Sequence, residues 1–144
     1  MRSFVFYLIF MSFFLSLSGC NANYKDISSD SIVAQYIGQI YVLKNDMNMS
    51  GINLPSGYGE NIDVYMVNKL YSVQHKAPEE ITSDIFPKGA TFTVEGVYEC
   101  TNCLSFSTLR NVSIITNDFS KAVDVPVIMS MHEIQSEENV TRVE

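Results

Sequence analysis

"ATFTVEGVYE", residues 90–99, is the stretch that decides the fold class. Phe92 and Val94 alternate with polar residues, and this period of two is typical of a strand with one buried face. Gly96 follows directly, and a glycine inside a strand pattern indicates a bulge or a sharp bend. The stretch therefore predicts a half-buried strand that bends at Gly96.

Similar strand signals occur on both sides of this stretch. Before it, apolar runs or alternation mark residues 40–43 and 62–67. After it, residues 111–118 and 125–134 have the composition of two last strands. The chain is therefore expected to be mainly β, with five or six short strands forming a small antiparallel barrel.

Three segments lack a clear strand signal. Residues 47–61 collect glycine, proline, serine and asparagine, so a long loop is expected there. Residues 77–86 allow one short helix, because Pro78 precedes two glutamates that would lie in a first turn. The charged segment 135–144 is expected to be a frayed tail.

"FPKGATFTVEGVYE", residues 86–99, resembles the pattern in bacterial SH3-like barrels of proline, lysine and glycine followed by a strand. The resemblance covers about one strand. It implies a small barrel of the SH3-like or OB-like kind in preference to a sandwich.

The N-terminus has the pattern of an export signal. Arg2 is the single charge before an apolar segment that runs from Phe4 to Leu17, interrupted by two serines. This segment has 14 residues, the length of a signal-peptide core and short for a membrane-spanning helix. It ends at "LSGC", residues 17–20, whose last residue is Cys20.

"LSGC" resembles the lipobox of bacterial prolipoproteins, in which small residues precede an obligatory cysteine. The resemblance implies that residues 1–19 are a cleaved signal peptide and that Cys20 carries lipid, including palmitate-type acyl chains. Two or more acyl chains attach a protein stably to a membrane. Residues 20–31 are then a polar tether and residues 32–144 a single β-rich domain.

The resemblance also bears on location and partners. It implies a lipid-anchored protein of the cell envelope, and Asn21 favours the periplasmic face of the outer membrane if the source is Gram-negative. Removing Arg2 with the signal leaves eight basic against sixteen acidic residues. Such an acidic chain has no electrostatic footprint for nucleic acid. The expected partners are the membrane, through lipid on Cys20, and an envelope protein.

Once Cys20 is assigned to lipid, Cys100 and Cys103 remain as a pair in "YECTNC". In an oxidising compartment the pair predicts a disulfide across a tight turn. The alternatives are a thioredoxin-like redox site and a zinc site completed by His75 and His132. The β-rich surroundings and the wide separation of the two histidines favour the structural disulfide.

Two methionine pairs raise the alternative of a soft-metal site. "MNM" contains Met47 and Met49, and "MSMH" contains Met129 and Met131 followed by His132. Thioether sulfur favours Cu(I), and residues two apart in a strand share a face. The same spacing suits two methionines in a core, where Met is a common filler.

Catalytic motifs are absent from the sequence. It has no G-x-S-x-G elbow, no H-E-x-x-H, no phosphate-binding glycine loop and no EF-hand pattern. The sequence therefore favours a non-enzymatic binding or scaffolding module without a cofactor. Periplasmic copper binding through the methionine pairs and Cys100/Cys103 is the alternative. The loop expected over 47–61, with Tyr58 as a contact residue, is the first candidate binding surface.

Overall fold

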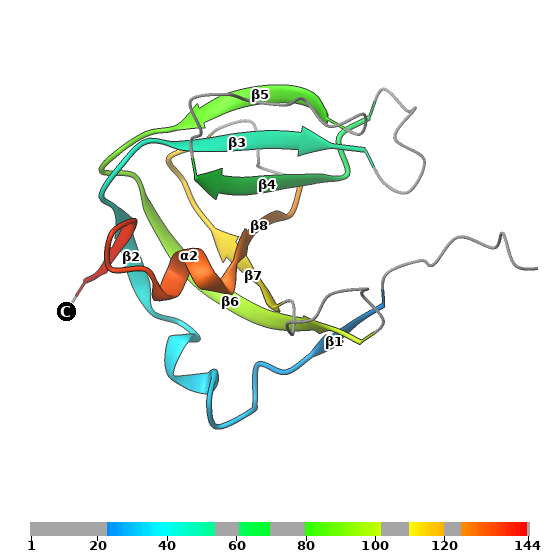
Figure 1. The fold of residues 1–144 in the computed structure, drawn as a ribbon, viewed down its shortest axis with the longest axis vertical. Helices are drawn as coiled ribbons and strands as arrows, with labels where there is room; N and C mark the ends of the chain where they lie inside the picture. The colour runs from blue at the N-terminus through cyan, green and yellow to red at the C-terminus, as the bar shows by residue number, and fades with distance from the viewer. Residues whose placement is uncertain (1–22, 54–60, 70–79, 102–109, 120–124, 144) are drawn as a thin grey trace, which may run out of the picture.

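The computed structural model describes residues 23–53, 61–69, 80–101, 110–119 and 125–143. Within these ranges the chain forms nine strands, one 3-10 turn and one short α-helix (Figure 1). In chain order they are β1 (Tyr24–Asp26), η2 (Ala34–Tyr36), β2 (Ile40–Leu43), β3 (Met47–Ile52), β4 (Val64–Lys69), β5 (Glu80–Phe86), β6 (Thr91–Cys100), β7 (Arg110–Ile115), β8 (Val127–Ser130), α2 (Met131–Gln135) and β9 (Val140–Arg142). The expected mainly β class is confirmed.

The nine strands belong to one strongly curved sheet. Its order is β5-β3-β4-β8-β7-β6-β2-β9, and β1 pairs with the far end of β6. The pairing between the described strands is antiparallel except between β4 and β8, which run parallel. The expectation of an antiparallel arrangement therefore fails at this one pair, and the strand order, which ends on β5 and β9, is that of an open sheet.

The strand over 91–100 has the predicted faces and the predicted bend. Phe92 and Val94 are 1% and 0% exposed, respectively. The register against β7 shifts between Val94 and Gly96. The bulge turns the peptide of Val97 towards the N-terminal segment, where its N–H donates to Ser28 Oγ at 2.9 Å. The predicted bulge at Gly96 is confirmed.

The core lies inside the curve of the sheet. It combines four aromatic residues with aliphatic and methionine side chains from the strands and from α2; the aromatic residues are Tyr41, Tyr65, Phe86 and Phe92. The Tyr41 and Phe92 rings stack with centroids 5.6 Å apart, and the Phe86 and Phe92 rings are 6.4 Å apart. Burial of such large apolar side chains is the main stabilising contribution to a domain of this size.

The loop expected over 47–61 is wrong for its first half, because Met47–Ile52 is β3, paired with β4 on one side and β5 on the other. Met47 and Met49 point into the core. On the polar face, Asn48 donates to Ser50 Oγ and accepts from Ser83 Oγ. Cross-strand partners thus satisfy residues whose composition suggests a loop.

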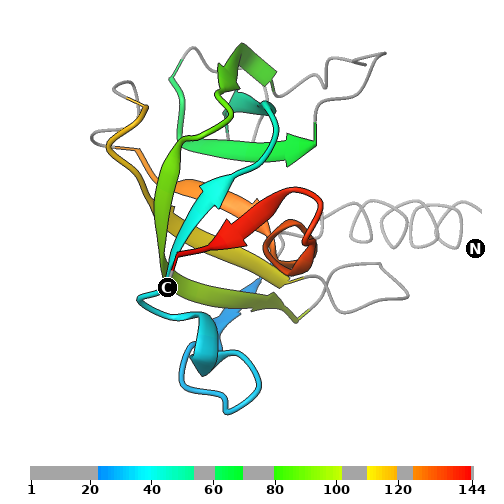
Figure 2. The same ribbon diagram turned by 90° about the vertical axis from the view of Figure 1, so that its left-hand side faces the viewer.

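The helix expected over 77–86 is wrong where the structure describes it, because Glu80–Phe86 is β5. The prediction of a frayed tail over 135–144 is also wrong, since Val140–Arg142 pairs with β2 as β9. Figure 2 shows β9 (red) beside β2 (cyan). Pairing also begins earlier than the expected domain start, because Tyr24–Asp26 of the predicted tether lies against β6.

Gly51 is a position where β3 needs the absence of a side chain. A Cβ atom there would lie 2.5 Å from Thr82 Oγ1 and 2.8 Å from Ile62 Cδ1. The Ile62 methyl lies at the end of a flexible side chain and can move, whereas Thr82 Oγ1 is one bond from the Cβ atom of a residue in β5. Within the described residues this oxygen is buried without a hydrogen-bond partner.

We therefore expect Gly51→Ala to lower the free energy of unfolding by about 1–3 kcal/mol through overpacking. Combining Gly51→Ala with Thr82→Ala removes the clashing oxygen and should recover most of the loss. The measurement is a double-mutant cycle from urea unfolding. Simple additivity of the two substitutions would contradict the close approach.

Candidate functional site

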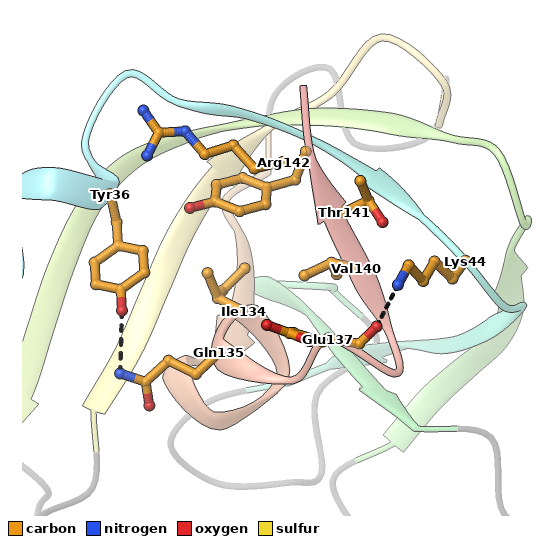
Figure 3. A pocket seen from close by; sticks show the side chains of 9 residues that line it. Tyr36, Lys44, Ile134, Gln135, Glu137, Val140, Thr141 and Arg142 are labelled. Carbon is orange, nitrogen blue, oxygen red and sulfur yellow. Dashed lines mark hydrogen bonds between the residues drawn. The ribbon is translucent and has the colours of Figure 1, made fainter. Parts of the chain in front are cut away.

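A pocket of about 450 Å3 opens where β9 packs beside β2 (Figure 3). Its walls come from η2 and β2 near the start of the described chain and from α2 and β9 near its end. The lining residues are Tyr36, Tyr41, Lys44, Ile134, Gln135, Glu137, Val140, Thr141 and Arg142. This volume lies in the range of small-molecule sites, which hold about 300–1,000 Å3.

The start of α2 and its orientation towards the core both follow from residues at its N-terminus and on its buried face. Ser130 is the N-cap of α2, and its Oγ accepts from the His132 N–H at 3.3 Å. Met131 and Ile134 are buried and anchor the helix to the sheet. The cap explains why the strand predicted over 125–134 ends at Ser130 and turns into a helix.

The segment between α2 and β9 is held by polar contacts. Buried Glu133 accepts a hydrogen bond from Asn139 Nδ2, and Asn139 is itself 5% exposed. Lys44 Nζ donates to the Glu137 carbonyl, and Asn45 Nδ2 donates to the Glu138 carbonyl at 3.0 Å. These contacts fix the rim of the pocket against the end of β2.

Tyr41 connects the pocket to the core. Tyr41 as a whole is 4% exposed and its ring stacks on Phe92, yet Tyr41 also lines the pocket. Burial raises the pKa of the Tyr41 hydroxyl above its ordinary value, Arg142 opposes this rise, and Tyr36 adds to it. Because both of these neighbours line the pocket, the hydroxyl is the end of Tyr41 that reaches it.

Arg142 and Tyr36 lie on either side of this hydroxyl. Arg142 is the direct cross-strand partner of Tyr41, so the two side chains share one face of the sheet. Tyr36, from η2, accepts a hydrogen bond at its hydroxyl from Gln135 Nε2 at 3.5 Å (Figure 3). The lining includes no His, Cys or Ser, so the site offers hydrogen bonding, charge and apolar contact.

The structure places some of the residues that the sequence singled out. Cys100 ends β6, is buried, and is half of a disulfide. Cys103 lies outside the described residues, so the Cys100–Cys103 pairing stays a prediction. Cys20, Tyr58 and His75 also lie outside them.

The methionine pairs lie in the core. Met47, Met49, Met129 and Met131 are each no more than 4% exposed. Met131 begins α2, so it does not share a strand face with Met129 as expected. His132 is exposed on the helix, whereas Met131 directly before it is buried. Among the described residues no three His, Cys, Asp or Glu side chains are grouped to hold a metal ion.

Sequence reasoning missed the pocket. Its signal was present in "NVTRVE", where Val140 and Arg142 flank Thr141, but the charges around it suggested a solvated tail. β9 becomes recognisable as a strand only when the fold shows that β2, paired with β6 on one side, has its other edge open to a partner. The sequence predicts Tyr41 in a strand but does not indicate where its hydroxyl points.

Comparison with protein-family models, curated proteins and solved structures finds no match for this chain. In the described part of the chain, no helix has the length and apolar character needed to cross a membrane.

The raised pKa of Tyr41 has a measurable consequence. We expect the Tyr41 phenol to ionise above pH 10, later than exposed tyrosines. Because the folded pKa is raised, the associated stability is present below the unfolded pKa near 10 and is lost as the pH rises through the folded value. The measurement is ultraviolet difference titration of the wild type against Tyr41→Phe. A phenol that Tyr41→Phe removes at or below pH 10 would contradict the assignment.

Proposed function

We propose that this protein is a lipid-anchored lipoprotein of the bacterial cell envelope whose β domain is a non-enzymatic binding module. The anchor rests on the apolar N-terminal segment and "LSGC", with Cys20 as the acylated residue and residues 1–19 as the signal peptide. Asn21 supports the periplasmic face of the outer membrane in a Gram-negative cell. A domain held in this way needs no membrane-spanning helix.

We also propose that the sheet forms a small barrel of the SH3-like or OB-like kind. The support comes from two consecutive ladders. β2 continues into β3, and β5 continues into β6, so each of these two stretches of chain can be regarded as one bent strand. The two bent strands pair with each other twice, as β2 with β6 and as β3 with β5. Between the ladders, the Leu43 N–H donates to the Ala90 carbonyl and the Gly89 N–H donates to the Leu43 carbonyl, both at 2.9 Å.

Counting each bent stretch as one strand makes the order circular. β2/β3 is followed by β4, β8 and β7, then by β6/β5, which pairs with β2/β3 again. Closure of this kind protects strand edges and leaves the loops at the rim for binding.

The observation that carries the binding role is the pocket between η2, β2, α2 and β9. It combines apolar walls with a few polar groups that converge on one space, which is the usual make-up of a ligand site. The candidate surface therefore moves from loop 47–61, whose first half is β3, to this pocket.

Two measurements test this function. Intact mass of the membrane-extracted protein should begin at Cys20 and include acyl chains, and Cys20→Ala should release the chain from the membrane. For binding, a photo-crosslinking residue at exposed Thr141 should form an adduct in the envelope. The same residue at exposed Lys25 on β1 is the control. An unacylated mass would overturn the anchor, and equal adducts at both positions would overturn the binding surface.

Soft-metal binding is the alternative function, and one observation favours it. Met49 and Met129 both pair with Val67, so one methionine of each pair lies on a strand beside β4, on opposite sides of it. The alternative predicts Cu(I) uptake by reduced protein that is lost in Met49→Leu with Met129→Leu. These substitutions conserve volume, so core packing alone predicts a nearly unchanged melting temperature and no difference in metal uptake.

A further inference from the structure

The hydroxyl of Tyr41 opens into the pocket. Tyr41 as a whole is 4% exposed, and its ring packs on Phe92. No hydrogen bond joins the hydroxyl to another group in the described part of the chain, and the hydroxyl is not sealed from solvent there. It is therefore free to hydrogen-bond to a ligand atom that enters the pocket.

Arg142 is exposed and lies near this hydroxyl, and its side chain has no ion pair or hydrogen bond within the described residues. The ion pairs of the described residues involve other basic side chains: Arg110 pairs with Glu99, and Lys69 pairs with Glu138. Arg142 and Tyr41 are directly opposite each other on β9 and β2, so their side chains lie next to each other on one face of the sheet. A guanidinium next to a phenol suits an oxyanion, which accepts from both.

The remaining charges of the pocket are Lys44 and Glu137. Lys44 Nζ donates to the Glu137 carbonyl, which leaves the ammonium charge without a carboxylate partner in the described residues. Two basic residues against one acidic residue make the lining net positive, although the whole chain carries a net charge of −7. A local reversal of sign in an acidic protein favours an anionic ligand.

We propose that this pocket binds a small organic anion through its carboxylate or phosphate group, with the Arg142 guanidinium and the Tyr41 hydroxyl as the donors. The proposal rests on the proposed binding function and specifies its ligand class. The ligand body lies against Ile134 and Val140, and the Gln135 amide offers a further hydrogen bond. Glu137 repels the anion and limits its affinity.

The test is calorimetric titration of the full lipoprotein in detergent with matched probes. Benzoate is paired with benzyl alcohol, and both glucuronate and glucose 6-phosphate are paired with glucose. We expect at least one anion to bind well below millimolar concentration while its neutral counterpart does not. Preference for benzoate or glucuronate assigns a carboxylate, and preference for glucose 6-phosphate assigns a phosphate.

Variants then locate the binding. Arg142→Gln and Tyr41→Phe should each weaken the anion about tenfold or more, because each removes a hydrogen bond to a charged group. The matched controls are Lys25→Gln, which removes a distant charge, and Tyr65→Phe, which removes the hydroxyl of another buried tyrosine. Both controls should bind as the wild type does. Glu137→Gln should tighten binding, since it removes a repulsive charge.

The proposal is overturned if no anionic probe binds at millimolar concentration, if neutral probes bind equally, or if Arg142→Gln leaves the affinity unchanged. Its failure is distinguishable from failure of the proposed function. A specific adduct from position 141 without anion binding would leave the binding module in place and reject its ligand class. Loss of both would reject the pocket as a binding surface.

Discussion

Replacing Phe92 with alanine should lower the free energy of unfolding by about 3–5 kcal/mol, the range for large aromatic residues in cores. Phe92 is 1% exposed and contacts the rings of both Tyr41 and Phe86. The substitution removes the stacking surface under Tyr41 and leaves a cavity between the two consecutive ladders. Domains of this kind have about 5–15 kcal/mol in total, so the loss should be visible as a large shift in the urea midpoint.

The same substitution should affect the pocket, because the Tyr41 ring rests on Phe92. Phe92→Leu keeps most of the volume and should cost less. Ile115→Ala is the control, since Ile115 is an exposed apolar residue at the end of β7. Equal effects of Phe92→Ala and Ile115→Ala on the urea midpoint would contradict the placement of Phe92 at the centre of the core.

Ending the chain after Ser136 should produce the second large effect. The deletion removes β9 and with it Val140, whose burial contributes roughly 1.5–3 kcal/mol. It also removes Asn139, the hydrogen-bond donor to buried Glu133, which adds roughly 1–3 kcal/mol for the stranded group. Tyr41 loses its cover, and the pocket loses one wall.

The expected results are a lower melting temperature and loss of anion binding by the truncated chain. Ending the chain after Arg142 is the matched control, because it keeps β9 and, of the contacts in the described part of the chain, removes the backbone hydrogen bond from Val143 to Ile40. Asn139→Ala separates the contribution of Glu133 from that of the strand. If the tail were frayed, as the sequence predicts, both truncated proteins would instead have the melting temperature of the wild type.

The proposed lipid anchor concerns the N-terminal residues, whereas both truncations concern the opposite end of the chain. A truncated protein that retains its acyl mass but no longer binds the anion would place these two properties in separate parts of the molecule. Calorimetry and intact mass on the same preparation provide both readings.

The sequence by itself determined the mainly β class, the strand over 40–43, and the faces and bulge of the strand over 91–100. These features depend on neighbours within a few residues: alternation places Phe92 and Val94 on one face, and Gly96 marks the register shift. The tertiary structure alone decided that Met47–Ile52 and Glu80–Phe86 are strands, because their stability comes from pairing with each other and with β4. It also decided the pocket, since Tyr41 and Arg142 meet only when the last strand pairs with the second, about a hundred residues earlier. Local propensity is weak beside such long-range pairing, and no pattern within a short window records which strand will become a neighbour.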